Sequence, residues 1–167
     1  KGQLSLINSS VLIIGCGGLG SAAINYLVMS GIGKIGIVDF DRVDKSNLSR
    51  QSLFNESDIG ILKVNAAKQK IFSINSTISL NTYNLKVTKN NISELLKPYN
   101  YILDCSDNFS TRYLINDSCY KQKKILISAA LHNFEIQLFS FKAWQNTNNP
   151  CYRCIFPKFK GINNIGN

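Results

Sequence analysis

The fold of this chain is decided by the sequence VLIIGCGGLG, which runs from Val11 to Gly20. Four consecutive apolar residues that end in glycines are typical of a buried parallel strand. The next residues, 19–29, carry small and apolar side chains at helical spacing, and Gly31 is a suitable C-terminal stop. A second apolar run, 35–38, predicts another strand, so this region forms a βαβ unit with the usual right-handed crossover.

The glycines between the first strand and the helix match the pattern G-x-G-x-x-G. Glycine lets backbone N–H groups approach phosphate oxygens, and the helix N-terminus adds a partial positive charge. An acid follows the second strand, 24 residues after the first glycine, where it can hydrogen-bond a ribose hydroxyl. We therefore predict a nucleotide site, although the glycines alone would also suit a tight structural turn. Its predicted residues are Gly15, Gly17, Gly18, Gly20 and Asp39.

The rest of the chain alternates between helical and strand patterns. Helices are predicted at 63–72, 92–96 and 110–121. Strands are predicted at 77–85, 101–104, 125–128 and 135–141. This succession predicts an α/β fold, a Rossmann-like three-layer sandwich with a mostly parallel sheet.

The length of 167 residues fits a single domain, 1–167, and an apolar content of 44% excludes a disordered or collagen-like chain. No stretch approaches the ~20 apolar residues of a membrane span, and the first residues do not form a signal peptide. We therefore expect a cytoplasmic protein without a membrane partner. Residues 161–167 predict neither a helix nor a strand, so we expect the chain to stop before its fold does.

The chain carries 19 basic and 10 acidic residues, a formal net charge of +9. The lysines are scattered and accompany many asparagines and isoleucines, which indicates an AT-rich genome. The alternative is attraction of an acidic partner, because net charge acts on association and not on fold. We expect no binding of nucleic acid.

The segment after Asp39 differs from that of a dehydrogenase, which continues with a short crossover. Here a long polar loop, 41–55, precedes a helix that begins at Lys63. Arg50 and Lys63 could converge on a triphosphate and neutralise charge on its α-phosphate and leaving pyrophosphate. The alternative is that both are ordinary surface charges. The loop also brings Asn47 and Gln51 close to the phosphate end of the site.

Residues 104–108, with the sequence DCSDN, follow a predicted buried strand. Ligands of α/β proteins bind at this C-terminal edge of the sheet. An acid there can hold Mg²⁺ against phosphate oxygens. The alternative is that Asp104, together with Asp107, caps the helix that follows.

Together these motifs resemble the ThiF/MoeB family, the bacterial relatives of ubiquitin-activating enzymes, over residues 2–157. The motifs are GCGGLG at 15–20, DFD at 39–41, SNLSRQ at 46–51, Lys63 and CSDN at 105–108. The resemblance implies an adenylyltransferase that uses ATP to adenylylate the C-terminal glycine carboxylate of a ubiquitin-like sulfur carrier protein ending in Gly-Gly. It also implies a homodimer and an N-terminal segment that this chain lacks.

The resemblance assigns roles by position. Gly18 and Asp39 would bind the nucleotide, Lys63 would contact phosphate, and Asp107 would hold Mg²⁺ with Asn108 beside it. The loop residues around the phosphates would be Asp41, Ser46, Asn47, Leu48, Ser49, Arg50 and Gln51. Catalytic roles fall to Arg50, Lys63 and Asp107.

Two features point to different carriers within the family. Residues 52–59 are more similar to the thiamine-pathway member, ThiF, which acts on the carrier ThiS. The DFD motif at 39–41 is more similar to the molybdopterin member, which acts on MoaD. We favour the ThiS type.

The sequence contains one C-x-x-C motif, formed by Cys151 and Cys154. The resemblance assigns this pair to half of a four-cysteine Zn²⁺ site, and a structural zinc needs four ligands. Cys16, Cys105 and Cys119 belong to other elements, so we expect the second pair to be missing and the zinc site to be half present. A redox pair is the alternative, but such a motif opens a helix, and the sequence 155–157 argues against one.

Two other functions stay open. An NAD-dependent oxidoreductase would share the glycine motif but would not need the loop 46–51 or Lys63. An inactive interaction domain of the same fold is the second alternative, because segments of the family pattern are missing at both ends.

Overall fold

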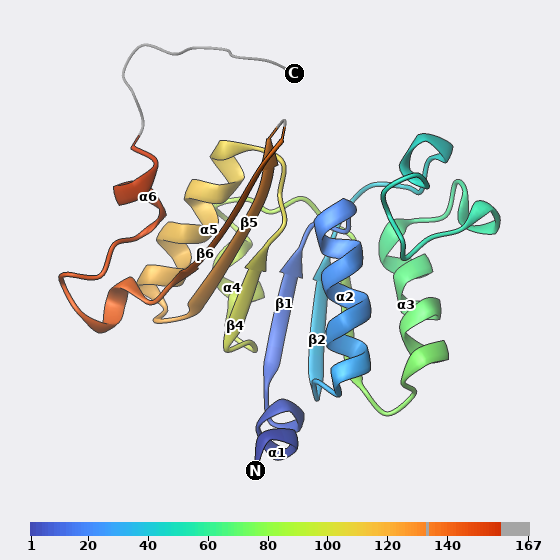
Figure 1. The fold of residues 1–167 in the computed structure, drawn as a ribbon, viewed down its shortest axis with the longest axis horizontal. Helices are drawn as coiled ribbons and strands as arrows, with labels where there is room; N and C mark the ends of the chain where they lie inside the picture. The colour runs from blue at the N-terminus through green and yellow to red at the C-terminus, as the bar shows by residue number, and fades with distance from the viewer. Residues whose placement is uncertain (133, 158–167) are drawn as a thin grey trace.

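The strand before the glycine turn, β1 (Ser10–Ile14), lies inside a six-stranded sheet whose order is β3-β2-β1-β4-β5-β6 (Figure 1). The computed structural model describes residues 1–132 and 134–157. The other strands are β2 (Lys34–Val38), β3 (Ser79–Tyr83), β4 (Tyr101–Asp104), β5 (Ile125–His132) and β6 (Glu135–Phe141). Four neighbouring pairs are parallel and the β5–β6 pair is antiparallel. The predicted mostly parallel, Rossmann-like sheet is confirmed.

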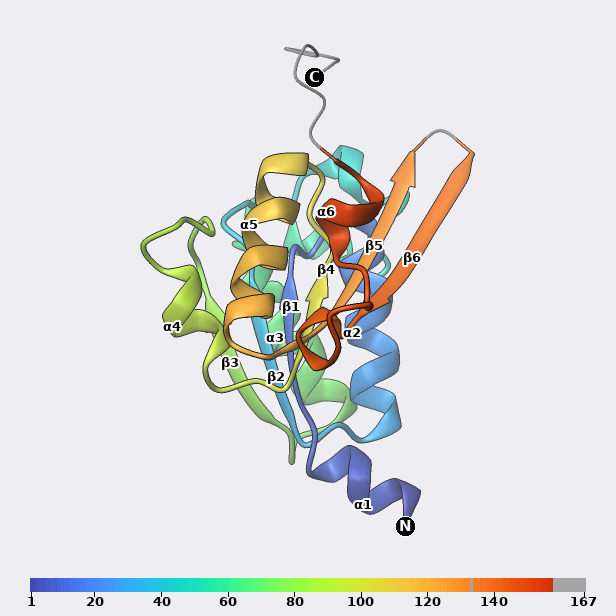
Figure 2. The ribbon, with the colours of Figure 1, turned by 90° about the vertical axis from the view of Figure 1, so that its left-hand side faces the viewer.

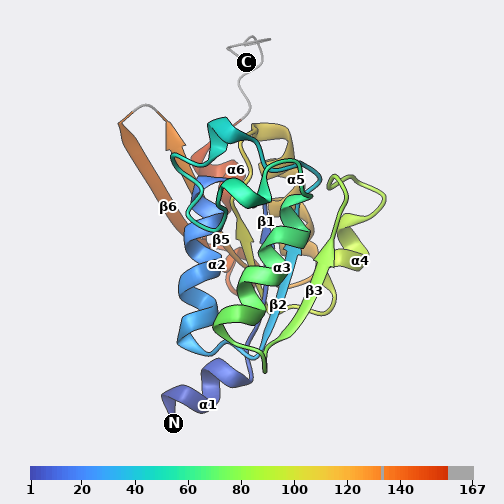
Figure 3. The same cartoon turned by 90° about the vertical axis from the view of Figure 1, so that its right-hand side faces the viewer.

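Helices flank this sheet. α2 and α3 lie on one side of it, and α4 and α5 lie on the other (Figures 1 and 3). The helices are α1 (Gly2–Ile7), α2 (Gly18–Ser30), α3 (Lys63–Ile74), α4 (Ile92–Leu96), α5 (Phe109–Lys121) and α6 (Tyr152–Ile155), with 3₁₀ turns η1 (Lys45–Asn47), η2 (Glu56–Asp58) and η3 (Ala143–Gln145). None of the helices within the described part of the chain is long and apolar enough to cross a membrane.

The side chains of β1 alternate between two apolar cores, because successive residues of a strand point to opposite faces of the sheet. Val11 and Ile13 pack in the core that contains Ile24 of α2. Leu12 and Ile14 pack in the core that contains Ile115 of α5. Burial on both faces explains why the strand is an unbroken apolar run.

The hairpin of β5 and β6 extends past the other strands (Figure 2). The sequence predicted only the part of β5 that pairs with β4; the strand continues to His132 and pairs there with β6 alone. Four large apolar side chains of this extension are more than 60% exposed, and we call them the hairpin patch. They are Leu131, Phe134, Ile136 and Leu138.

Two further elements differ from the sequence predictions. α1 was not predicted, and none of its residues is buried. The prediction that the C-x-x-C motif does not open a helix was wrong, because Cys151 is the N-cap residue of the short helix α6. The prediction for residues 161–167 lies outside the described residues.

Candidate functional site

The glycine turn and the DCSDN loop meet where the order of the sheet reverses direction, between β1 and β4. Open α/β sheets bind ligands at this position, beyond the carboxyl ends of the strands. The two loops touch: a Cβ on Gly15 would lie 2.8 Å from the backbone oxygen of Cys105, and Gly15 has φ +99°. A cleft of about 1050 Å³ opens here and is lined by most residues of the glycine turn and of the loop 46–51, and by Lys63 and Asp107.

Asp39 joins two walls of this cleft. Its Oδ2 accepts a hydrogen bond from the backbone N–H of Cys16 at 2.7 Å, and its Oδ1 accepts one from Asp41 N–H at 2.8 Å. The carboxylate lines the cleft although the residue is only 9% exposed. The ribose contact stays a prediction. The two backbone bonds connect the glycine turn, at Cys16, with the segment that follows β2, at Asp41.

Two cations of the predicted site lie in the same cleft. Lys63 is buried at the start of α3, and its Nζ lies 3.3 Å from Oδ2 of Asp41. Arg50 is exposed, and its Nη1 donates to the backbone oxygen of Ser46 at 3.0 Å. A buried ammonium and an exposed guanidinium can therefore face the same anionic ligand.

A buried amide of the loop has an unused acceptor. Gln51 is 2% exposed and lines the cleft, yet its Oε1 accepts no hydrogen bond from the residues that the structure describes. Buried polar atoms nearly always have a partner. A ligand that donates a hydrogen bond, such as a nucleotide amino or hydroxyl group, would satisfy this atom.

The two acids of the DCSDN loop have different environments. Asp107 is exposed at the cleft, whereas Asp104 is 1% exposed and accepts hydrogen bonds from Ser106 and Ser128. Burial raises the pKa of Asp104, against the opposing effect of these bonds. Mg²⁺ is commonly bound by one or two carboxylates together with substrate phosphates. Asp107 fits that role, and Asp104 does not.

The residue after Asp107 has a structural function. Oδ1 of Asn108 accepts the backbone N–H of Thr111 at 2.9 Å and caps α5. The cap suggested for Asp104 and Asp107 is thus made by the asparagine, which leaves the Asp107 carboxylate available to a ligand.

Three predicted residues do not line the cleft. A Cβ on Gly20 would lie 1.8 Å from the backbone oxygen of Gly15, so Gly20 allows α2 to pack against the turn. Leu48 packs against the apolar core. The hydroxyl of Ser49 donates to the Ser46 backbone oxygen at 3.5 Å. These three residues support the turn and the loop that line the cleft, without lining it themselves.

Sequence reasoning missed several lining residues. The segment after β3 lies beside Asp39, whose N–H donates to the oxygen of Tyr83. The rule that ligands bind at the carboxyl ends of strands could have identified this segment, because β3 is parallel to β2. Its lining residues are Leu85, Lys86 and Val87; the others missed include Phe40, Arg112 and Leu131.

The C-x-x-C thiols lie together, with 3.7 Å between the sulfur atoms of Cys151 and Cys154. Two sulfurs of a tetrahedral site with Zn–S bonds of about 2.3 Å lie roughly 3.8 Å apart, so the pair fits half of a zinc site. Burial raises the pKa of the other three thiols, Cys16, Cys105 and Cys119, which disfavours their thiolate forms. Within residues 1–132 and 134–157, no cluster of three or more potential ligands occurs.

Comparison with known proteins gives consistent matches. The ThiF family matches residues 1–164. The chain is 39% identical over 160 residues to the sulfur carrier protein adenylyltransferase of Thermus thermophilus. This match covers 95% of this chain and 59% of that protein. It is 46% identical over 157 residues to the adenylyltransferase and sulfurtransferase MOCS3 of Dictyostelium discoideum. This match covers 94% of this chain and 36% of that protein. The chain therefore spans less than two thirds of these curated relatives.

Solved structures share the fold. A structure of E. coli MccB with succinimide has a TM-score of 0.80 and 28% identity, and the match covers 93% of this chain and 46% of that one. A structure of the E. coli tRNA N6-threonylcarbamoyladenosine dehydratase TcdA with ATP has a TM-score of 0.73 and 25% identity, over 75% of this chain and 52% of that one. The family match extends over nearly the whole sequence, and the chain belongs to the ThiF family.

Proposed function

We propose that this domain binds ATP and Mg²⁺ in the cleft and adenylylates the C-terminal glycine carboxylate of a ubiquitin-like sulfur carrier. One observation carries the proposal: Arg50, Lys63 and Asp107 line the same cleft as the glycine turn. Hydride transfer to NAD would not need this set of charges. The names of the two adenylyltransferase relatives support the same activity. The ATP bound to TcdA, which is named as a tRNA dehydratase, supports only the binding of ATP by this fold.

The carrier carboxylate would attack the α-phosphorus of ATP, form an acyl-adenylate and release pyrophosphate. A carboxylate is already ionised at neutral pH, so no general base is needed. Lys63 and Arg50 would stabilise the negative charge that develops on the phosphates, and the glycine turn would supply backbone N–H groups. Mg²⁺, held by Asp107, would supply further charge neutralisation. Catalysis then consists of positioning and electrostatic stabilisation.

We further propose a ThiS-type carrier, from the resemblance of residues 52–59. In the structure this segment contains η2, whose N-cap Asn55 and Asp58 form a reciprocal capping box beside α3. Adenylylation of purified ThiS-type and MoaD-type carriers, compared by kcat/KM, would test the choice. A preference for the MoaD type would assign the domain to the molybdopterin carrier instead.

Calorimetry separates the main proposal from the oxidoreductase alternative. We expect the chain to bind ATP with Mg²⁺ and to show no comparable affinity for NAD. In the presence of its carrier, it should exchange labelled pyrophosphate into ATP. Tight binding of NAD without exchange would favour the oxidoreductase. Binding of neither nucleotide would favour an inactive interaction domain.

The hairpin patch supports a protein partner for this reaction. Leu131 belongs to the patch and also lines the cleft, so the apolar surface is continuous with the site. Large exposed apolar patches mark interaction surfaces. We propose that the carrier body covers the patch while its tail enters the cleft. An Ile136→Asp change should then raise the KM for the carrier and leave ATP binding intact. If the change instead alters only the mass measured by sedimentation, the patch belongs to the homodimer interface.

Salt should weaken the association with the carrier. Part of the +9 charge would attract an acidic carrier face, and exposed charges are screened over about 8 Å at physiological ionic strength. We expect the association rate, measured by stopped-flow fluorescence, to fall as salt rises. A rate that does not depend on salt would leave the charge as a consequence of genome composition.

A further inference from the structure

The side chain of Arg112 connects three parts of the fold. It extends from the first turn of α5, and its Nη1 donates to the backbone oxygen of Ala129 in β5 at 3.2 Å. Its Nη2 donates to the backbone oxygen of Ser106 in the DCSDN loop. The residue is buried and lines the cleft, and no carboxylate of the described residues forms an ion pair with its guanidinium. The two hydrogen bonds hold the backbone of two separate segments.

One of these segments leads directly into Asp107. The N–H and Oγ of Ser106 donate to Oδ1 of Asp104 at 3.0 and 2.6 Å, while its carbonyl accepts from Arg112. A peptide group is planar, so the direction of the Ser106 carbonyl fixes the direction of the Asp107 N–H and the position of its Cα. On the other side, Asn108 is held as the cap of α5. The backbone is therefore held on both sides of Asp107.

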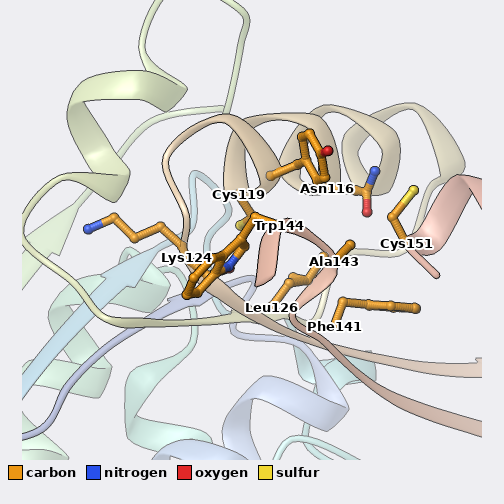
Figure 4. A pocket seen from close by; sticks show the side chains of 9 residues that line it. Asn116, Cys119, Lys124, Leu126, Phe141, Ala143, Trp144 and Cys151 are labelled. Carbon is orange, nitrogen blue, oxygen red and sulfur yellow. The ribbon is translucent and has the colours of Figure 1, made fainter. Parts of the chain in front are cut away.

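α5 is a firm support for this guanidinium. Figure 4 shows Asn116 and Cys119 of α5 facing Trp144 around a space of about 10 Å³, which is no larger than one water molecule. Oδ1 of Asn116 accepts the N–H of Tyr152 at 2.9 Å, and Nε1 of Trp144 donates to the backbone oxygen of Lys124 at 3.1 Å. Close packing of this kind leaves α5 little freedom to shift, so the position of the guanidinium is set by the helix.

We propose that Arg112 is a positioning residue for the Mg²⁺ site: it holds the Ser106 carbonyl so that the Asp107 carboxylate stays directed toward the cleft. The inference rests on the proposed binding of Mg²⁺ by Asp107. Coulomb repulsion alone gives the opposite expectation, because a guanidinium repels a metal ion and its removal should tighten metal binding. Loss of a partner that orients a metal ligand instead weakens the binding, usually by 10- to 100-fold. The sign of the change therefore separates the two effects.

The contribution of the metal to nucleotide binding tests this inference. Calorimetry gives the affinity for a non-hydrolysable ATP analogue with and without Mn²⁺, which takes the same oxygen ligands as Mg²⁺. The ratio of the two affinities, the metal factor, excludes any direct contact between Arg112 and the nucleotide. Methionine keeps most of the apolar stem without donor or charge, and we expect Arg112→Met to lower the metal factor about tenfold or more. Asp107→Ala should remove the metal factor altogether.

Asn116→Ala is the matched control. It removes a buried hydrogen bond of the same helix and leaves Arg112 and the DCSDN loop in place, so it should lower the temperature of thermal unfolding but not the metal factor. Hydrogen exchange without metal or nucleotide gives a second readout. Peptides that contain residues 105–108 should exchange faster in Arg112→Met and at the parent rate in Asn116→Ala. If Arg112→Met does not fold, Arg112→Lys replaces it, with one donor nitrogen instead of two and a smaller fall in the metal factor.

A metal factor of Arg112→Met equal to that of the parent would overturn the inference, and so would a larger one. An equal fall in Asn116→Ala would assign the effect to the packing of α5 and would also overturn it. If Mn²⁺ does not raise the affinity of the parent chain, or if Asp107→Ala keeps the full metal factor, the proposed Mg²⁺ site fails and the inference fails with it.

Discussion

Replacing Lys63 by alanine is expected to lower the turnover number of carrier adenylylation about 100-fold or more, as loss of a group that stabilises developing charge does. The ammonium is buried at the start of α3 and reaches the cleft beside Asp41. Arg50→Ala should have an effect of the same size, since its guanidinium lines the phosphate side of the cleft. Steady-state kinetics with ATP and the carrier would give kcat and KM separately.

The separation of kcat from KM decides the role of these cations. If only the KM for ATP rises, both residues bind the ground state and do not act on the transition state. Lys45→Ala is the control, because Lys45 is an exposed cation in the same loop and does not line the cleft. Its turnover number should match that of the parent. Arg50→Ala also avoids the unpaired Asp41 that Lys63→Ala creates.

Asp107→Ala is expected to abolish Mg²⁺-dependent exchange of pyrophosphate into ATP while the fold persists. The carboxylate is exposed and lines the cleft, so its loss removes a metal ligand without opening the core. Exchange of labelled pyrophosphate measures the activity, and the temperature of thermal unfolding measures the fold. Normal exchange in this variant would contradict the assignment of Asp107 to Mg²⁺.

Variants of two other acidic residues serve as controls for Asp107→Ala. Glu94→Ala removes an exposed carboxylate of α4, outside the cleft, and should leave exchange unchanged. Asp104→Ala should instead lower the unfolding temperature, because Ser106 and Ser128 would lose their buried acceptor. Loss of exchange without loss of stability is therefore expected for Asp107 alone among these three acids.

The strands were predictable where both faces are buried. β1, β2 and β4 are short apolar runs, and their ends in the structure lie within one residue of the prediction. The second half of β5 was not predictable in this way, because its exposed side chains gain their strand conformation from pairing with β6. α6 has only four residues and depends on contacts with α5, which local sequence does not show.

The charged residues of the candidate site were predictable from the sequence. Which of their side chains face the cleft was less predictable. The order of motifs placed Asp39, Lys63 and Asp107 at one edge of the sheet, since parallel strands bring their carboxyl ends together. Sequence alone left open whether Asp104 or Asp107 faces the cleft, because both follow the same strand. Burial decides this: Asp104 is buried, and Ser128 of the next strand, 24 residues away, donates to its carboxylate.

The carboxylate of Asp39 connects the glycine turn with the segment that follows β2. It accepts the N–H of Cys16 in the turn and the N–H of Asp41 in that segment, so both segments are held in place without a nucleotide. The loss of conformational entropy of these residues therefore belongs to folding and not to binding. A nucleotide meets a preorganised surface, so the entropy of complex formation should reflect mainly the release of water and the ordering of exposed side chains such as Arg50.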